Sequence, residues 1–525
     1  MEGIPGNPVN TLFAFMDSKL LLSIVIGYFI LLLVVAYYTS RGSNNESFFI
    51  GNKNSNWMLV AFGMIGTSLS GMTFISVPGT VGMSGFDYFQ VVLGYFIGYF
   101  VVAGVLLPLY YRMHLTSIYS FLEAKLGTLP YKTGASFFIL SRTLGATLRL
   151  YLVIKVLQLF ILDNLGISFE VTAVLIMLMI LLYTFKGGVK TIVWTDTLQT
   201  TFMLLALVVC TVYIMNHLGL DFKGTMDTLK SQNLTRIFIT DPLDKNFFLK
   251  QILGGAFVTI TMTGLDQEMM QKNISVSNLR DSKKNMMVFS SIMVLVNFLF
   301  LILGGLLFLY AQKNGLSLKG DDLFPTIAVQ QGLPFYITVI FIIGLISALF
   351  PSADGALTAL TSSFCIDILG MKQRTEWDEK KKTRVRLTVH LTMAFVFLLC
   401  IFVFREIDNG SLINTLLVVA SYTYGPLLGL FAFGLFIKRG VKERLVPFIC
   451  VLSPVICFTI NLMAGAYKQY EWIMNNPSLH NFFSQTEAMF GGYKIGLEML
   501  ILNGLITIGL LAATSTKLKT VAQAA

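Results

Sequence analysis

Long apolar runs, separated by short polar connectors, follow one another along almost the whole chain. A helix needs roughly 20 apolar residues to cross a bilayer, and runs of that kind recur from Leu20 to Leu511. Charged residues make up 13% of the 525 residues, about half the fraction found in soluble domains. The sequence therefore predicts an all-α integral membrane protein. It excludes a soluble enzyme on a single anchor, a disordered chain and a disulfide scaffold.

The apolar runs and the residues that interrupt them predict about thirteen membrane-spanning helices. The expected spans are residues 20–39, 57–80, 86–111, 133–160, 169–185, 190–215, 248–271, 286–311, 333–367, 387–404, 410–437, 445–466 and 494–514. The first run lacks the basic flank and the cleavage site of a signal peptide, so we expect it to remain as a helix. No connector is long enough for a separate domain, and we expect one integral membrane domain over residues 1–525.

The distribution of Lys and Arg predicts the orientation of the chain. If the N-terminus lies outside, the inner connectors hold far more of these cations than the outer ones, Lys272 and the basic run 372–386 among them. The positive-inside rule then predicts a cytoplasmic C-terminus in a protein of the cell (inner) membrane. The net charge of +10 thus indicates topology rather than nucleic-acid binding. We expect 372–386 to be a solvated loop, with binding to anionic lipid headgroups as the alternative.

Two of the expected spans are unusually rich in Gly, Ser and Thr: residues 61–79 (AFGMIGTSLSGMTFISVPG) and 253–267 (LGGAFVTITMTGLDQ). They are the first and the sixth core helices once the span at 20–39 is set aside. Interrupted helices at corresponding positions of two inverted five-helix halves bind ions and substrate in many secondary transporters. We therefore expect both segments to unwind at mid-membrane; the alternative is close helix packing through small residues. Close helix contact is also the expected role of the GxxxG pairs Gly94/Gly98 and Gly425/Gly429.

Ionisable residues within spans are costly and indicate function. Arg142 and Arg149 on the fourth span are seven residues apart and so share one helix face. For Arg149, near mid-depth, two roles are open: an ion pair with a buried carboxylate, or a clamp for an anionic solute, because a guanidinium matches a carboxylate bidentately.

Acidic residues also lie within or at the ends of spans, at Asp196, Asp266 and Asp354. A buried carboxylate beside hydroxyls suits sodium, because hard cations take oxygen ligands; for Asp266 a helix end near the cytosol is the alternative. The chain has no GxxxxGK[ST] motif, and its four His are scattered. Neither ATP hydrolysis nor metal or Ser-His-Asp catalysis is predicted, and we expect no enzyme activity.

Several motifs together carry a resemblance to the sodium:solute symporter family. They are FISVPGTVGMSG, YTFKGGVKTIVWTDTLQ, TGLDQEMMQK, SALFPSADGALTALTSSFCIDIL and ASYTYGPLLGLFAFGLF, and the likeness covers nearly the whole chain. The resemblance implies a five-plus-five inverted repeat, a LeuT-type core. One helix (20–39) would precede the two repeats (57–215 and 248–437), and two helices (445–514) would follow them.

The same resemblance implies a sodium site between the first and eighth core helices. Its ligands would be the backbone carbonyls of Gly66, Leu69 and Ala348 and the hydroxyl of Ser352. Family members carry a second hydroxyl where this chain has Pro351, which could weaken the site or shift the ion toward Asp354. A second sodium ion would use Asp196 with hydroxyls of the eighth helix. Because those hydroxyl positions read Pro351, Asp354 and Gly355, a site rebuilt around two carboxylates is the alternative to no second site.

Within the family the chain looks most like the sialic-acid transporters. The resemblance implies that small hydroxyl residues, two Phe, a Gln and an Arg surround the sugar acid, at Ser68, Ser70, Thr73, Phe86, Gln90, Arg149 and Phe257. We therefore expect sodium-coupled symport of a small organic solute, with an acidic sugar such as sialic acid as the first candidate. The alternatives are a neutral sugar, a polyol or another carboxylate, and, from another class, a membrane sensor or channel. The expected partners are solute, sodium ions and the lipid bilayer, with no nucleic acid and no obligatory protein partner.

Overall fold

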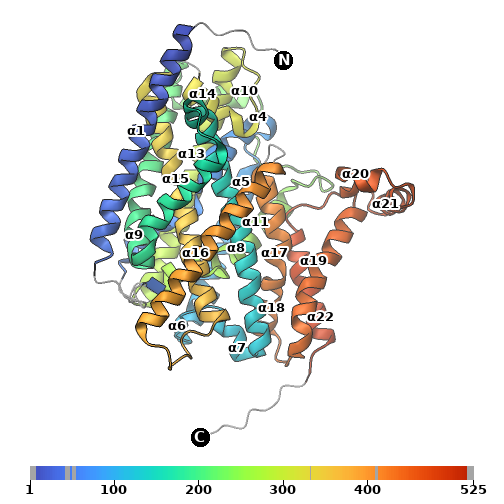
Figure 1. Cartoon of the computed structure of the whole chain (residues 1–525). Helices are drawn as coiled ribbons and strands as arrows, with labels where there is room; N and C mark the ends of the chain where they lie inside the picture. The colour runs from blue at the N-terminus through green and yellow to red at the C-terminus, as the bar shows by residue number, and fades with distance from the viewer. Residues whose placement is uncertain (1–7, 42–47, 50–54, 331–332, 408–411, 517–525) are drawn as a thin grey trace.

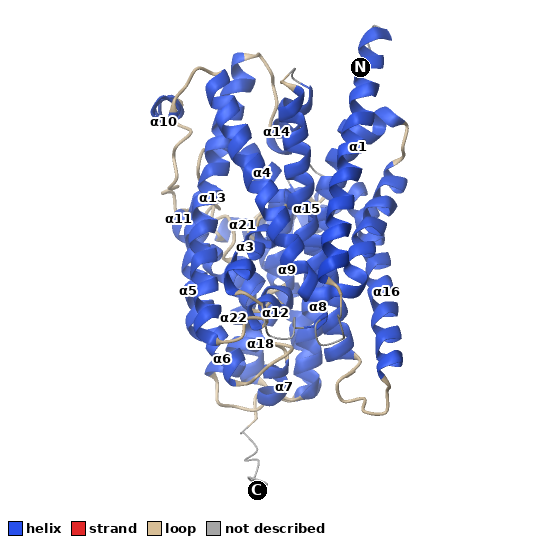
Figure 2. Cartoon of the chain, turned by 90° about the vertical axis from the view of Figure 1, so that its left-hand side faces the viewer, coloured by secondary structure: helices blue, strands red, loops and turns tan. Residues whose placement is uncertain are grey.

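The computed structural model describes residues 8–41, 48–49, 55–330, 333–407 and 412–516. Within these residues the regular secondary structure is helical, and β-structure is limited to isolated bridges. Figure 2 shows the helices gathered into one upright bundle. The all-α prediction is confirmed.

The long helices follow from the apolar runs, and short helices fill the connectors. The bounds are α1 (Pro8–Thr39), α3 (Trp57–Ser68), α4 (Gly71–Ser84), α5 (Tyr88–Val101), α6 (Leu107–Arg112), α7 (Ser120–Leu126), α8 (Thr128–Leu157), α9 (Phe169–His217), α10 (Phe222–Ser231), α11 (Phe248–Thr259), α12 (Gln267–Ile274), α13 (Leu279–Lys313), α14 (Leu323–Gln330), α15 (Phe335–Ser363), α16 (Glu379–Glu406), α17 (Leu412–Thr423), α18 (Gly425–Phe436), α19 (Val446–Met463), α20 (Glu471–Met474), α21 (Pro477–Met489) and α22 (Met499–Ala513).

By length and composition, eight helices of the described chain could cross a membrane, or up to 11 if each bent pair counts as one span. Two shorter apolar helices, Phe169–Phe185 and Met499–Ala513, coincide with two further expected spans. The count of thirteen spans stays a prediction, as does the division into two repeats.

Both predicted interruptions are present. α3 and α4 meet at an angle of 56°, with Leu69 and Ser70 between them. The second break, of 63°, lies at Leu265 and Asp266, after a π-helical turn that prolongs α11 to Gly264. A third bend, of 41°, separates α17 from α18 within the span expected at 410–437, of which residues 410 and 411 lie outside the described chain.

The spans expected at 169–185 and 190–215 are two helices, Phe169–Phe185 and Gly188–His217, which share the label α9. They meet at a kink at Gly188, whose φ of 51° and ψ of −142° are not helical. Glycine populates positive φ without the steric cost that other residues meet. A positive φ at this one residue is therefore enough to change the chain direction between the two helices.

The broken helices lie against long, continuous ones. α3 packs on α9 and α15, and α5 packs on α11. A Cβ added at Gly94 would lie 2.2 Å from the Ile252 carbonyl oxygen, and one at Gly98 would lie 2.5 Å from that of Ala256. Gly425 and Gly429 approach α22 as closely, so both GxxxG pairs make the close helix contacts that were predicted. Figure 1 shows α10 and α14 at the end of the bundle where α1 begins, and α6 and α7 at the opposite end.

Candidate functional site

A cavity of about 90 Å³ lies where the two broken helices meet. Ser68, Ser70 and Thr73 line it from the break between α3 and α4, and Thr259 and Thr263 line it from α11 and the π-helical turn. Ser and Thr suit this position because their hydroxyls can bind the backbone groups that a helix break frees. Their small size also lets the helices approach closely. The cavity is thus polar on the side of both interruptions.

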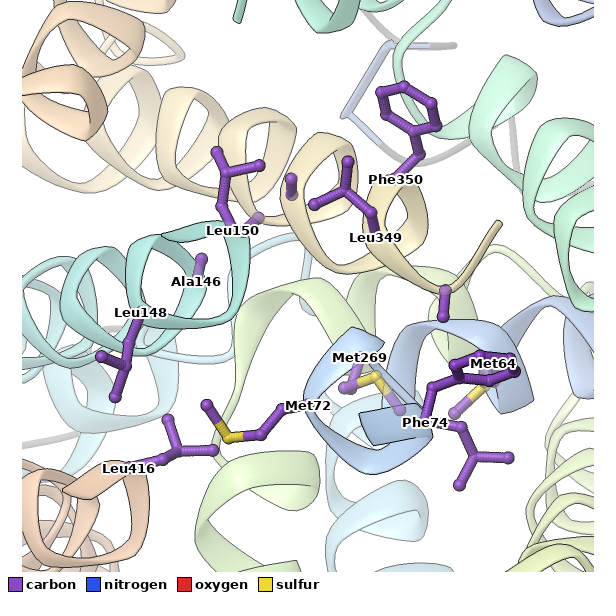
Figure 3. Packing of buried hydrophobic residues seen from close by; sticks show 14 of the residues in the cluster. Met64, Met72, Phe74, Ala146, Leu148, Leu150, Met269, Leu349, Phe350 and Leu416 are labelled. Atoms are coloured by element: carbon purple, nitrogen blue, oxygen red, sulfur yellow. The ribbon is translucent and has the colours of Figure 1, made fainter. Parts of the chain in front are cut away.

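Apolar side chains line another part of this cavity. Figure 3 shows Met72 of α4 near Leu416 of α17, with Met269 of α12 in the same region, and all three line the cavity. Small-molecule sites combine an apolar wall with a few convergent polar groups, and this cavity has both.

Arg149 and Arg142 both line this cavity, and among the described residues Arg149 has no acidic partner. It lines the cavity from α8 and is 9% exposed. It forms no ion pair with any described residue, and its Nε has no hydrogen-bond partner. Tyr88, Tyr95 and Tyr99 line the same cavity. A buried guanidinium with unused donors beside a cavity is suited to bind a carboxylate.

Arg142 lies two turns before Arg149 on α8. It forms ion pairs with buried carboxylates, which is the role that was the alternative to solute binding for Arg149. Its Nη2 donates to Glu268 Oε2, and its Nε lies 3.8 Å from Asp266 Oδ2. Asp266 also accepts from the backbone N–H groups of Glu268 and Met269 and from the Tyr424 hydroxyl at 3.1 Å. Asp266 therefore caps α12 at the break and is buried, so it is a helix-end residue inside the protein.

Lys272 continues this network. Its Nζ donates to Asp196 Oδ2 at 2.6 Å, to Thr67 Oγ1 at 2.6 Å and to Glu268 Oε1 at 3.4 Å. The side chain is 3% exposed. The prediction that Lys272 is a connector cation is wrong, because α12 is buried in the protein interior after the break at Asp266.

The residues expected at the main sodium site lie close together on α3 and α15. α3 ends at Ser68, so the carbonyls of its last turn, that of Gly66 included, lack the following helical amides as partners. Ala348 and Ser352 are one turn apart on α15 and are fully buried. The Ser352 hydroxyl donates to the Leu349 carbonyl at 2.9 Å and keeps its lone pairs as acceptors. This set of oxygens fits sodium.

A residue that the sequence analysis missed lies next to this site. A Cβ added at Gly66 would be 2.3 Å from Thr200 Oγ1 and 3.4 Å from Pro351 Cγ. Thr200 Oγ1 is buried and has no hydrogen-bond partner among the described residues. A polar atom buried without a partner is rare and calls for an explanation, and here it lies against Gly66, as the Pro351 ring does. Its one sequence signal is the spacing of four from Asp196, which places both on one face of α9.

The two carboxylates of the expected second sodium site have separate partners. Asp196 Oδ2 binds Lys272 and accepts from Thr67 Oγ1 at 3.2 Å. Asp354 Oδ2 accepts from the Tyr183 hydroxyl at 2.7 Å. An ammonium group already binds the Asp196 carboxylate, so these residues do not fit a second sodium ion.

Three expected solute-binding residues lie outside the lining of the cavity, and their role stays a prediction. Gln90 holds the connector after α10: its Nε2 donates to the Asn246 carbonyl at 3.3 Å, and its Oε1 accepts from the Ile239 N–H at 3.1 Å. Phe86 is buried against Phe298. Phe257 is partly buried in the apolar core, although Val258, the next residue, does line the cavity.

A second cavity, of about 380 Å³, adjoins the first. Tyr88 and Leu417 line both cavities. The larger one extends past Ser84 and Asp87 to residues 495–499, between the ends of α4 and α22. Tyr88 and Leu417 therefore lie between the central cavity and the larger cavity, which extends toward the end of α4.

The model of the sodium:solute symporter family matches residues 48–443, which is most of the chain. The chain belongs to this family. The symporter is 23% identical over 440 residues to the sodium/sialic acid symporter SiaT of Proteus mirabilis (strain HI4320), an alignment that covers 79% of this chain and 84% of SiaT. It is 22% identical over 497 residues to the sodium/sialic acid symporter NanT of Aliivibrio fischeri (strain ATCC 700601 / ES114), covering 90% and 89%.

Other relatives of the symporter act on different solutes. The sodium-coupled monocarboxylate transporter 2 of Mus musculus is 24% identical over 433 residues, covering 79% of this chain and 66% of the relative. Among solved structures, a substrate-bound, outward-open Na⁺-coupled sialic acid symporter matches with a TM-score of 0.75 and 18% identity, over 95% of this chain and 99% of that chain. The shared fold confirms the predicted transporter architecture. The symporter is thus a sodium-coupled membrane transporter and not an enzyme.

Proposed function

We propose that the symporter carries an acidic sugar, with sialic acid as the first candidate, together with sodium. The observation that carries this proposal is Arg149, a buried guanidinium on a polar cavity with no acidic partner among the described residues. Leaving such a charge unpaired is unfavourable in a low-dielectric interior, so the site favours a solute that brings its own carboxylate. Two relatives are named for sialic acid and one for monocarboxylates, which agrees with this chemistry.

In this proposal the solute binds between the two breaks. Its carboxylate pairs with the guanidinium of Arg149, while Ser68, Ser70 and Thr73 offer hydroxyls to the sugar. Tyr99 and Asn297 add further polar groups to the wall of the same cavity.

The coupled sodium ion binds the carbonyl oxygens of Gly66, Leu69 and Ala348 and the Ser352 hydroxyl, and Thr200 Oγ1 replaces the hydroxyl missing at Pro351. Leu69 belongs to both sites: it is the first residue after α3, and it lines the solute cavity. A sodium ion that orders this turn lowers the ordering cost of binding the solute, and by linkage the solute tightens the sodium ion equally. Alternating access then carries both across the membrane.

The larger cavity is the route from outside, and Tyr88 and Leu417 are the side chains that the solute passes. This assignment uses the orientation predicted from Lys and Arg, with the N-terminus outside and the C-terminus in the cytoplasm. α1 begins at the end of the bundle to which the larger cavity leads (Figure 1).

The experiment that tests the proposed solute compares sialic acid with its methyl ester, which keeps the sugar and removes the charge. Purified symporter should bind the acid much more tightly than the ester in sodium buffer, by calorimetry or thermal shift. Arg149→Ala should remove that preference. Equal affinity of the wild type for acid and ester would refute the carboxylate clamp and favour a neutral solute.

A further inference from the structure

We propose that the Lys272 ammonium is a built-in cation of the symporter, which occupies the carboxylate site at Asp196 and leaves the chain with one sodium ion per transport cycle. The inference rests on the proposed sodium-coupled function. It concerns a different site, on the far side of Thr67 from the solute cavity, and it comes from the contacts of Lys272.

The contacts of Lys272 use the full donor capacity of an ammonium group. A lysine ammonium has three N–H donors, and Nζ has three oxygen partners, at 2.6 Å (Asp196), 2.6 Å (Thr67) and 3.4 Å (Glu268). These partners come from α9, α3 and α12. Two carboxylate oxygens and a hydroxyl around one buried cation are also the oxygen ligands that a hard metal cation selects.

The surroundings of Lys272 contain more carboxylates than cations. Asp196, Glu268, Asp266 and Asp354 are all buried, and Arg142 is the second cation of the network. Glu268 bridges the two cations, with Oε2 on Arg142 and Oε1 on Lys272. Without Lys272, the Asp196 carboxylate has no other cation partner among the described residues, and the site would attract a positive ion.

The helices around the site approach one another closely at glycines. A Cβ added at Gly355 would lie 2.1 Å from Glu268 Oε1, so α15 touches this carboxylate with its backbone. At Gly63 of α3, an added Cβ would lie 3.2 Å from Asp196 Cβ. Removal of the lysine head group therefore leaves an oxygen-lined space between helices that meet at glycines.

A tethered ammonium differs from sodium in its consequence for coupling. Sodium binds and leaves in each cycle, whereas the lysine stays on α12 and keeps that helix joined to α3 and α9. The Lys272 ammonium supplies the positive charge at Asp196 permanently, so no second sodium ion has to bind there. A single exchangeable sodium ion therefore remains, at Gly66 and Ser352.

The test counts sodium ions bound to the purified, full-length protein, with ²²Na⁺ as the probe. We expect about one ion per wild-type protein and about two on Lys272→Met. Adding Asp196→Asn to Lys272→Met should return the count to about one, which places the extra ion at Asp196. Lys250→Met is the matched control: Lys250 is equally a buried lysine, but its Nζ donates to the carbonyls of Asp244 and Lys494 at 3.0 Å, and the count should stay at about one.

Folding of the variant gives a second measurement. If Lys272→Met is unstable, sodium chloride should recover the monodisperse fraction in size-exclusion chromatography, and choline chloride should not. Two sodium ions bound to the wild type, or only one ion bound to a folded Lys272→Met, would overturn the inference. So would an equally low monodisperse fraction of Lys272→Met in sodium chloride and in choline chloride. None of these results touches the proposed symport, whereas a wild type that binds no sodium would refute both.

Discussion

Two arginines on one face of α8 show how neighbours of the same type take different roles. Arg142 binds Glu268 and Asp266, whereas Arg149 lines the cavity and has no acidic partner in the part of the chain that the structure describes. The sequence predicts that both lie within one span. It does not predict which of them forms the ion pair, because Glu268 lies more than a hundred positions further along the chain. The break at Asp266 brings that carboxylate to Arg142 and away from Arg149.

Replacing Arg149 tests its geometry separately from its charge. Arg149→Lys keeps the cation but loses the two-pronged donor set, and Arg149→Ala loses both. A hydrogen bond to a charged group contributes about 1.5–3 kcal/mol, so uptake of the acidic sugar at low concentration should fall roughly 10- to 100-fold in each variant. Sodium binding should be unchanged, which controls for folding. Full uptake by Arg149→Ala would contradict the assignment.

The hydroxyls at the sodium site can be removed one at a time. Ser352→Ala and Thr200→Val each delete a proposed oxygen ligand, and we expect each to raise the sodium concentration for half-maximal uptake, by about tenfold for a loss of about 1.4 kcal/mol. Thr201→Val, the neighbouring threonine on the exposed face of α9, is the control. If Thr200→Val behaves like Thr201→Val, Thr200 is not a ligand, and Pro351 leaves the site one hydroxyl short.

At the scale of the helices, composition predicts which two segments are interrupted. It does not predict at which residue each break lies. Gly, Ser and Thr in 61–79 and 253–267 identified both interrupted helices. The second break lies at the C-terminal limit of its segment because a π-helical turn extends α11 to Gly264 and because Asp266 caps α12. Cap and turn depend on contacts with Arg142 and Tyr424, which no local pattern reveals.

The packing of α5 on α11 gives a prediction for one helix pair. Gly94→Ala places a methyl group against the Ile252 carbonyl, with backbone on both sides, and should lower the free energy of unfolding by about 1–3 kcal/mol. Gly104→Ala is the control in the same span, because a Cβ there meets nothing within 4 Å. The measurement is thermal unfolding of the purified proteins. Equal melting temperatures would contradict the close approach.

At the scale of the whole molecule, the membrane architecture and the family could be read from the apolar runs and the motifs. Lys272 shows what could not be read. Its partners Thr67, Asp196 and Glu268 come from three helices, and only the folded chain brings them to one ammonium group. By sequence alone this lysine lies in a charged connector.

One sodium ion and one singly charged sugar acid carry no net charge together. Uptake of the acid should therefore be insensitive to a membrane potential set by potassium and valinomycin in proteoliposomes. A doubling or more of the uptake rate under an inside-negative potential would show that a further cation moves, and would contradict the single-sodium cycle.

Sodium-coupled symport is tested most directly by uptake of labelled sialic acid into proteoliposomes, with and without an inward sodium gradient. A panel of neutral sugars, polyols and monocarboxylates would compete for uptake. We predict accumulation of sialic acid that needs the sodium gradient, that is lost in Arg149→Lys, and that sugar acids inhibit better than neutral sugars. Uptake that is independent of sodium, or a neutral sugar that competes better than every acid, would contradict the account.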